Sequence, residues 1–419
     1  MARAPALYSR CCQFATTAKV GWYRYKALCP SPITSRRWFT AGQTAQTRMG
    51  HESENHSEPR NAWIGAKGPG SLDLRSDVVT TPTPGMLAAI ASCTLLDDVF
   101  GEDGTTAGLE AHVAGLANKE AGLFVVSGTM GNQLALRSLL KQPPYAVACD
   151  HRAHIVTSEA GGVSCLTGAT VQPIVPKNGM HLTLDDIVAN VVVGDDVHDC
   201  PTRVISLENT LHGMVMPLDE VERISSYARQ HSIAMHCDGA RLWEACAAGA
   251  GSLAQFCAHF DTISLCFSKG LGAPVGSVLV GSAATLRHAR WVRKSIGGGM
   301  RQAGVLTAAA RVAVDKTFGK TGDGSDGLLP QSHATAKRVE ALWTSMGGVV
   351  AHPVHTNMCW LNLEAAGCTV DAFIRACAEQ GLRASGGRLV THYQVAQNAD
   401  DVLGRLERVF AKILATASA

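Results

Sequence analysis

The sequence lacks several features that assign a chain to particular protein classes. It has no run of 18 or more apolar residues, so it predicts no transmembrane helix. Its formal net charge of +2 gives no reason to expect nucleic acid or an anionic membrane as a partner. Its 14 cysteines include no C-x-x-C pair and no zinc-finger spacing, which favours reduced thiols packed as small apolar side chains over a metal or disulfide role. We therefore expect a globular protein of a reducing compartment with no metal site.

Acidic residues are also missing from the first 50 positions, which contain eight arginines and lysines and many serines and threonines. This composition is typical of a mitochondrial transit peptide. The alternative is a disordered basic tail, in which case we expect a cytoplasmic protein. A polar stretch at 51–60 has the composition of a linker. We therefore assign residues 1–70 to a transit peptide and a disordered linker.

After this segment, short apolar runs alternate with helical patterns such as 132–140 and 218–231. This alternation predicts an α/β fold with a mainly parallel, seven-stranded sheet covered by helices, which forms a large domain at 71–325. A Gly- and Asp-rich stretch near 319–330 precedes a smaller α+β domain at 326–419. There we expect helices at 332–346, 370–380 and 399–416, and strands at 349–353, 357–363 and 388–395. The seven strands of the large sheet are expected at 122–126, 146–149, 171–175, 204–207, 233–237, 262–267 and 275–280.

The turn at 127–132 (Ser-Gly-Thr-Met-Gly-Asn) follows a predicted strand and opens a helix. Free backbone N–H groups and the helix dipole make such a turn an anion site, and its glycines allow a phosphate to approach. It matches neither G-x-G-x-x-G nor the P-loop pattern, so a nucleotide site is not supported. A plain helix N-cap is an equally good interpretation of this turn alone.

Asp238 and Lys269 each follow a predicted buried strand. A buried carboxylate needs a cationic or donor partner, and a pyridinium nitrogen is one, with a salt bridge to Arg241 as the alternative. Burial lowers the pKa of a lysine and favours a Schiff base with an aldehyde, whereas a surface lysine at a strand end is the alternative. His154 follows another strand and could stack on a ring or be an ordinary loop histidine.

Together these features occur in the order phosphate turn, stacking histidine, aspartate and lysine, and Lys269 follows Asp238 by 31 residues. This gap accommodates one crossover helix and one strand. The order and the gap are those of a pyridoxal-phosphate (PLP) enzyme of the aspartate-aminotransferase fold type.

The chain closely resembles the low-specificity L-threonine and L-allo-threonine aldolases over roughly residues 72–314. The resemblance rests on Asp-Leu-Arg-Ser-Asp at 73–77 and on the motifs at 97–103, 127–132, 238–241, 268–270 and 297–304, with further agreement at 356–358 and 388–392.

The resemblance implies a role for each matching residue. Lys269 forms the Schiff base with pyridoxal phosphate, His154 stacks on its ring and Asp238 pairs with its pyridine nitrogen. The catalytic residues are thus Lys269, His154 and Asp238. The further cofactor-binding residues are Gly128, Thr129, Arg241 and Arg301, and Arg301 comes from a neighbouring subunit of a homotetramer that shares its active sites. Ser76, Arg241 and Arg388 hold the substrate carboxylate, a task that suits the planar guanidinium.

The expected reaction is aldol cleavage of a β-hydroxy-α-amino acid to glycine and an aldehyde. One departure concerns the histidine that the family places after Glu208-Asn209-Thr210: this chain has Leu211 there, and His212 follows. A shift by one residue turns an extended side chain the other way, so the substrate hydroxyl is handled by a rearranged His212, by water or by His154. An amino-acid racemase of the same family and a catalytically impaired homologue are the alternatives.

Overall fold

The computed structural model describes residues 69–417, so the expected transit peptide and linker lie outside the described part of the chain up to residue 68. Within 69–417, no helix is both long and apolar enough to cross a membrane. Short 3-10 helices η1 (Pro69–Leu72) and η2 (Asp77–Val79) come first. The strands are β1 (Ala121–Val125), β2 (Ala146–Asp150), β3 (Thr170–Ile174), β4 (Thr202–Glu208), β5 (Ala234–Asp238), β6 (Thr262–Cys266), β7 (Ser277–Gly281), β8 (Met358–Trp360) and β9 (Arg388–Val390).

Within residues 69–417, fifteen α-helices lie before, between and after these strands. Those before β4 are α1 (Pro84–Ala91), α2 (Gly104–Leu116), α3 (Gly128–Leu139), α4 (His154–Thr157), α5 (Gly162–Thr167) and α6 (Leu184–Asn190). Those up to residue 318 are α7 (Leu218–Gln230), α8 (Leu242–Ala247), α9 (Leu253–Cys257), α10 (Ala283–Ser295) and α11 (Gly304–Ala313), which continues as a π-helical turn, η3 (Val314–Phe318). The last four are α12 (Leu329–Ser345), α13 (Val370–Glu379), α14 (Tyr393–Ala396) and α15 (Ala399–Ala417).

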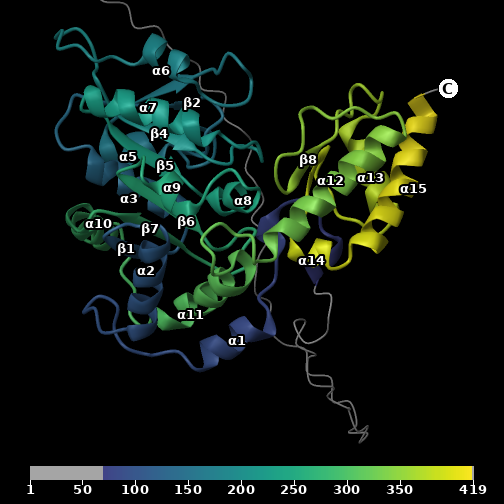
Figure 1. Cartoon of the computed structure of the whole chain (residues 1–419), viewed down its shortest axis with the longest axis horizontal. Helices are drawn as coiled ribbons and strands as arrows, with labels where there is room; N and C mark the ends of the chain where they lie inside the picture. The colour runs from purple at the N-terminus through teal and green to yellow at the C-terminus, as the bar shows by residue number, and fades with distance from the viewer. Residues whose placement is uncertain (1–68, 418–419) are drawn as a thin grey trace, which may run out of the picture. The chain divides into compact units, whose positions relative to one another are not determined.

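The large sheet has seven strands in the order β1-β7-β6-β5-β4-β2-β3 (Figure 1). All neighbours are parallel except β7, which is antiparallel to both β1 and β6. The predicted α/β class and all seven predicted strands are confirmed, each to within a few residues. Because the strands other than β7 run in one direction, their carboxyl ends meet at one edge of the sheet, which is where ligands bind in such folds.

Helices cover both faces of this sheet, because alternate strand residues enter different cores. Phe124 and Val278 belong to one hydrophobic cluster, which also contains residues of α2, α7, α9 and α11. Leu123 and Leu279, their neighbours in sequence, belong to another cluster with residues of α3 and α10. The period of two along each strand thus places the strand between two helical layers.

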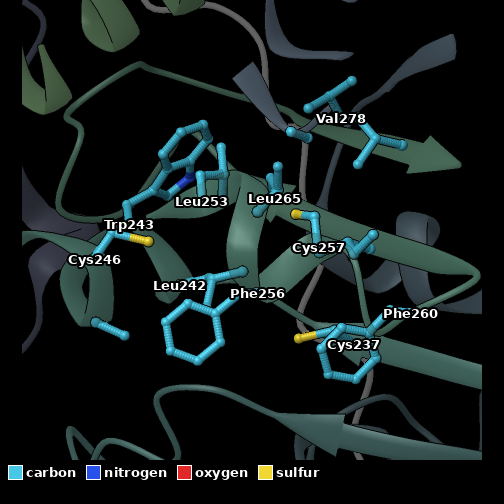
Figure 2. Packing of buried hydrophobic residues seen from close by; sticks show 14 of the residues in the cluster. Cys237, Leu242, Trp243, Cys246, Leu253, Phe256, Cys257, Phe260, Leu265 and Val278 are labelled. Carbon is cyan, nitrogen blue, oxygen red and sulfur yellow. The ribbon is translucent and has the colours of Figure 1, made fainter. Parts of the chain in front are cut away.

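The first of these cores holds three of the buried thiols. Cys237, Cys246 and Cys257 lie among Trp243 and Phe256, as Figure 2 shows, and burial raises the pKa of the Cys257 thiol to about 12. All cysteines within residues 69–417 are free. Seven of these eleven cysteines are buried, as expected of small apolar side chains, whereas three are partly buried and Cys165 is exposed.

A separate core forms after residue 330, where α12 and α13 each pack against α15 (Figure 1). It contains the buried side chains of Trp343, Phe373 and Phe410, and the amino-terminal Leu74 joins it. β8 and β9 pair antiparallel, with Trp360 opposite Arg388. The division expected at residue 325, between domains 71–325 and 326–419, stays a prediction.

None of the three expected C-terminal strands has its expected length: the strand at 349–353 is wrong, and those at 357–363 and 388–395 are shorter, the first of them being β8, Met358–Trp360. Residues 349–353 form only an isolated bridge between Val350 and Leu361, and Pro353 has no N–H to extend a ladder. The strand expected at 388–395 ends at residue 390, and the following residues form α14. Tyr393 of α14 donates from its hydroxyl to the Thr81 carbonyl, so a contact distant in sequence ends this strand early.

Candidate active site

The predicted site residues follow the carboxyl ends of the parallel strands. Asp238 is the last residue of β5 and pairs in register with Glu208, the last residue of β4. His154 opens α4 shortly after β2, and Lys269 follows β6. The charges of Lys269 and Asp238 act on both His154 and Glu208, so the structure brings these four side chains into one site.

Asp238 does not form the salt bridge to Arg241 that was the alternative interpretation. Its carboxylate is buried and accepts hydrogen bonds from Asn132 Nδ2 at 2.7 Å and from the Ala240 N–H at 3.1 Å. Asn132 lies on α3, and its Oδ1 atom is 3.1 Å from Nε2 of the buried His236. Asp238 is therefore held by two donors, and no cation of the described part of the chain is in hydrogen-bonding contact with it.

His154 is paired with Glu159, five residues later. Its Nδ1 atom lies 2.7 Å from Oε1 of Glu159, whose side chain is fully buried, while the His154 side chain is 36% exposed. The hydrogen bond to Glu159, and then the charge of Asp238, raise the pKa of His154 against the opposing effect of burial. His154 thus presents one edge of its ring to a buried carboxylate, as a positioned base does.

Glu208 was quoted in the sequence only as part of a motif, and the structure adds it to the site. Burial and the neighbouring Asp238 carboxylate raise the pKa of Glu208. Its Oε2 atom accepts from the His154 backbone N–H at 2.8 Å. Two carboxyl groups, those of Glu208 and Asp238, therefore share the edge between β4 and β5.

A second group gathers the arginines expected to bind the substrate carboxylate. Asp77 is fully buried and accepts from Arg241 Nε at 2.8 Å and Nη2 at 2.7 Å. Burial opposes ionisation of Asp77, but the charge and hydrogen bonds of Arg241, together with the Lys269 charge and the Asn357 hydrogen bond, lower the Asp77 pKa. Burial and the Arg241 charge lower the pKa of Arg388, so a second guanidinium lies within range of the Arg241–Asp77 pair without contacting Asp77. A substrate carboxylate would balance the remaining positive charge.

Ser76 lies beside this group as the N-cap of η2. Its hydroxyl is 3.4 Å from Oδ1 of Asp77 and accepts from the Val78 N–H. Arg388 donates to the Arg75 carbonyl at 3.0 Å and lies 5.8 Å from the ring of Trp360. All three residues expected in the clamp are therefore close to Asp77, through contacts or charge.

The predicted phosphate turn opens α3, where Ser127 is the N-cap and accepts from the Met130 N–H at 3.1 Å. Gly128 and Thr129 are the first two helical residues. The hydroxyl of Ser277 is buried without a hydrogen-bond partner and lies 3.7 Å from where a Cβ of Gly128 would be. Free N–H groups, a helix N-terminus and an unpaired hydroxyl meet the needs of a phosphate.

These observations test whether pyridoxal phosphate fits. Within residues 69–417 the buried Asp238 has no cation in hydrogen-bonding contact, the charges of Asp238 and Lys269 both act on Glu208, and the helix start provides donors for an anion. A protonated pyridine nitrogen, an aldehyde and a phosphate match these groups in turn. His154, Glu159 and Asp238 also lie close enough to hold a metal ion, but Asn132 already donates to both carboxylates. The residues fit the cofactor.

Two expected residues lie apart from the group around Asp238. Arg301 donates to Asp97 at 2.8 Å, lies over the Phe100 ring at 5.9 Å and is 57% exposed at its side chain. His212 has φ of 55° and its carbonyl accepts from Trp360 Nε1. Its ring centroid is 5.4 Å from that of Trp360.

Leu211, which occupies the family's histidine position, is buried. His212, one of the candidates for handling the substrate hydroxyl, lies against Trp360.

Comparison with known proteins agrees with this geometry. The family model described as beta-eliminating lyase matches residues 73–366. The chain is 56% identical to an aldolase, vrtJ, from Penicillium aethiopicum over 83% of this chain and 87% of that one. It is 45% identical to the alanine racemase TOXG of Cochliobolus carbonum, covering 80% and 86%. It is 44% identical to the low specificity L-threonine aldolase of Saccharomyces cerevisiae, covering 78% and 83%.

The fold matches a solved threonine aldolase from Leishmania major with a TM-score of 0.64 at 22% identity, covering 80% of this chain and 99% of that one. The chain belongs to the beta-eliminating lyase family, and its resemblance to the L-threonine aldolases is confirmed. It is a lyase, and its cofactor is pyridoxal phosphate. The individual roles expected for the site residues stay predictions.

Proposed function

We propose that the protein cleaves L-threonine and L-allo-threonine to glycine and acetaldehyde. The observation that carries this proposal is the convergence of Lys269, Asp238 and the His154–Glu159 pair at one edge of the sheet. Each of these groups has a task in breaking a Cα–Cβ bond next to an amine and a hydroxyl. The identity to the yeast threonine aldolase supports this substrate class.

The substrate carboxylate binds at Arg241, which is paired with Asp77, and at Arg388, which lies within range of both of their charges. This anchor helps to orient the Cα–Cβ bond, because a fixed carboxylate restricts the orientations that the bonds at Cα can take. Lys269 and Asp238 would hold pyridoxal phosphate, Lys269 through the aldehyde and Asp238 through the pyridine nitrogen. When bound, this cofactor supplies an electron sink for the pair left on Cα.

His154 takes the proton of the β-hydroxyl on its Nε2 atom. The O–H electron pair becomes the second bond of the aldehyde C=O, the Cα–Cβ pair moves to Cα, and a proton from solvent then completes glycine. His154 suits this task because its Nδ1 atom is occupied by Glu159.

A second candidate, racemisation of an amino acid, is favoured by one observation. Leu211 replaces the hydroxyl-handling histidine, and His212 contacts Trp360 instead. Racemisation needs no such group, and a relative at 45% identity is named an alanine racemase. Incubation with L-allo-threonine separates the two: glycine and acetaldehyde support cleavage, whereas loss of optical activity from L-alanine without either product supports racemisation.

We also propose a homotetramer with shared active sites. Four apolar side chains in the segment before α2 are exposed, and Arg301 lies over one of them, Phe100. Exposed clusters of this kind mark protein interfaces. Light scattering on a size-exclusion column tests this assembly; a monomer contradicts it. The exposed apolar residues are Leu95, Leu96, Val99 and Phe100.

Mitochondrial location is likewise our proposal, and it rests on the basic, acid-free residues 1–50. A fusion of these residues to a fluorescent reporter tests it. The proposal predicts mitochondrial fluorescence, and a cytosolic reporter contradicts it.

A further inference from the structure

Glu159 accepts three hydrogen bonds although it contacts neither substrate nor cofactor in the proposed reaction. Oε1 lies 2.7 Å from His154 Nδ1 and accepts from Asn132 Nδ2 at 2.8 Å, and Oε2 accepts from Gln133 Nε2 at 2.6 Å. Its side chain is fully buried. The two donors on Oε1 hold the oxygen that faces His154, because moving it would break two charge-assisted hydrogen bonds.

Asn132 connects this carboxylate to Asp238. The same Nδ2 atom that donates to Glu159 also donates to Asp238 Oδ2 at 2.7 Å, so its two hydrogens are both used. The amide cannot be reversed, because its oxygen would then face two carboxylates. Its Oδ1 atom must therefore accept, and His236 Nε2 is the donor at 3.1 Å.

The state of His236 agrees with this assignment. Burial lowers the pKa of His236 to about 4, so its ring is neutral at pH 7 and carries one N–H. That N–H is on Nε2, and Nδ1 then accepts from the Thr262 hydroxyl at 2.9 Å. A chain of hydrogen bonds therefore runs from Thr262 through His236 to Asn132, and Asn132 donates to the carboxylates of both Glu159 and Asp238.

The proton on His154 follows from the same reasoning. Glu159 is an acceptor for the donors Asn132 and Gln133, so the nitrogen of His154 that faces it carries a hydrogen. In the neutral ring this places the lone pair on Nε2. The charged or titratable groups that act on His154 are Glu159, Asp238, Glu208 and Lys269.

We propose that Glu159 is a positioning residue that fixes His154 with Nδ1 protonated and Nε2 free to take the substrate's hydroxyl proton, and that Asn132 keeps this pair in register with Asp238. The inference rests on the proposed aldol cleavage, which assigns the proton transfer to His154. It explains how the chain handles the hydroxyl although Leu211 replaces the histidine that relatives place there. Glu159 does not touch the reacting atoms, so it acts through His154.

The test compares Glu159→Gln with Gln133→Met in the full-length holoenzyme. Glu159→Gln removes the charge that holds the imidazole, whereas Gln133→Met removes only the donor to the other oxygen. We expect Glu159→Gln to lower kcat for threonine about a hundredfold, within the usual contribution of a positioned acid or base, with KM changed less than about threefold. Gln133→Met should keep kcat within about threefold of the wild type.

Two readouts separate positioning from a merely structural role. Without the Glu159 charge the pKa of His154 falls, so the acidic limb of the kcat profile moves to lower pH. The NMR titration midpoint of the His154 Cε1–H, assigned by its loss in His154→Asn, should fall by about one pH unit. Glu159→Asp, which keeps the charge but shortens the side chain, should restore the midpoint while kcat stays reduced.

Equal losses of kcat in Glu159→Gln and Gln133→Met, or an unchanged His154 midpoint in Glu159→Gln, would overturn the inference. If Glu159→Gln does not fold, Glu159→Asp decides: kcat equal to that of the wild type contradicts the inference, and a reduced kcat with unchanged KM supports it. A wild-type enzyme that does not cleave threonine overturns the proposed function instead. The NMR midpoint then still tests the pairing of His154 with Glu159.

Discussion

Removal of the Asp77 carboxylate is predicted to destabilise the protein strongly. Asp77 is fully buried, and its two oxygens hold the largely buried Arg241 through two hydrogen bonds of 2.7 and 2.8 Å. Asp77→Asn leaves the Arg241 charge without its counterion in a site where the nearby Arg388 repels it. Breaking one partner of a buried ion pair costs about 3–5 kcal/mol, so we expect a loss of that order in the free energy of unfolding.

The assay is urea unfolding monitored by circular dichroism, with Asp73→Asn as the matched control. Asp73 pairs with Arg75, whose side chain is 46% exposed, so water can solvate the arginine when its partner is lost. That loss should stay below about 1 kcal/mol. If Asp77→Asn costs no more than the control, Arg241 does not depend on Asp77 and the reasoning is refuted.

The pH dependence of this difference has a definite sign. The folded-state pKa of Asp77 is lowered, chiefly by Arg241 against the effect of burial. The stabilisation from Asp77 is therefore complete above the unfolded-state pKa of about 4 and is lost as the pH falls toward the folded-state pKa. We expect the difference between wild type and Asp77→Asn to be largest near neutral pH and to shrink below about pH 4.

Three further predictions concern the site. Lys269→Ala should abolish both threonine cleavage and the visible absorbance band that borohydride removes from the wild type, and a retained band contradicts the Schiff-base assignment. Arg388→Lys should raise KM for threonine about tenfold or more, because an ammonium cannot bind a carboxylate bidentately; unchanged steady-state kinetics contradict the clamp. A Cβ at Gly131 would lie 2.3 Å from the Ser264 hydroxyl, so Gly131→Ala should displace the start of α3 from β6 and weaken cofactor binding in an equilibrium titration. Gly108→Ala, in α2 with open space around the added methyl group, is its control and should bind the cofactor as the wild type does.

The sequence predicts the part of the fold that depends on local pattern. Most strands of the large sheet are apolar runs, and buried parallel strands need no partner-specific signal. The end of β9 could not be predicted in this way. Residues 391–395 continue a strand-like alternation of Thr391, Tyr393 and Val395 with His392 and Gln394, whereas in the structure Tyr393 donates to the Thr81 carbonyl, 312 residues away, and lies in α14. The isolated bridge at Val350 likewise depends on the distant Leu361.

For the site, the chain order of strand-end residues predicted that Lys269 and Asp238 lie near each other, and the structure places both after strands of the large sheet, with their charges acting on the same side chains. The hydrogen-bond partners of the site residues could not be predicted in this way, because they depend on side-chain contacts between elements far apart in sequence. Glu159 follows His154 by five residues, yet only the structure shows that Asn132 joins it to Asp238. The signal that the sequence offers for this link is Asn132, a polar side chain at the end of the predicted phosphate turn.

The most direct test of the proposed reaction is product analysis of the purified holoenzyme with L-threonine and with L-allo-threonine. The account predicts equal amounts of glycine and acetaldehyde from at least one of the two, released at a rate that falls in Glu159→Gln but not in Gln133→Met. Recovery of unchanged or racemised amino acid, with neither product formed, would contradict it.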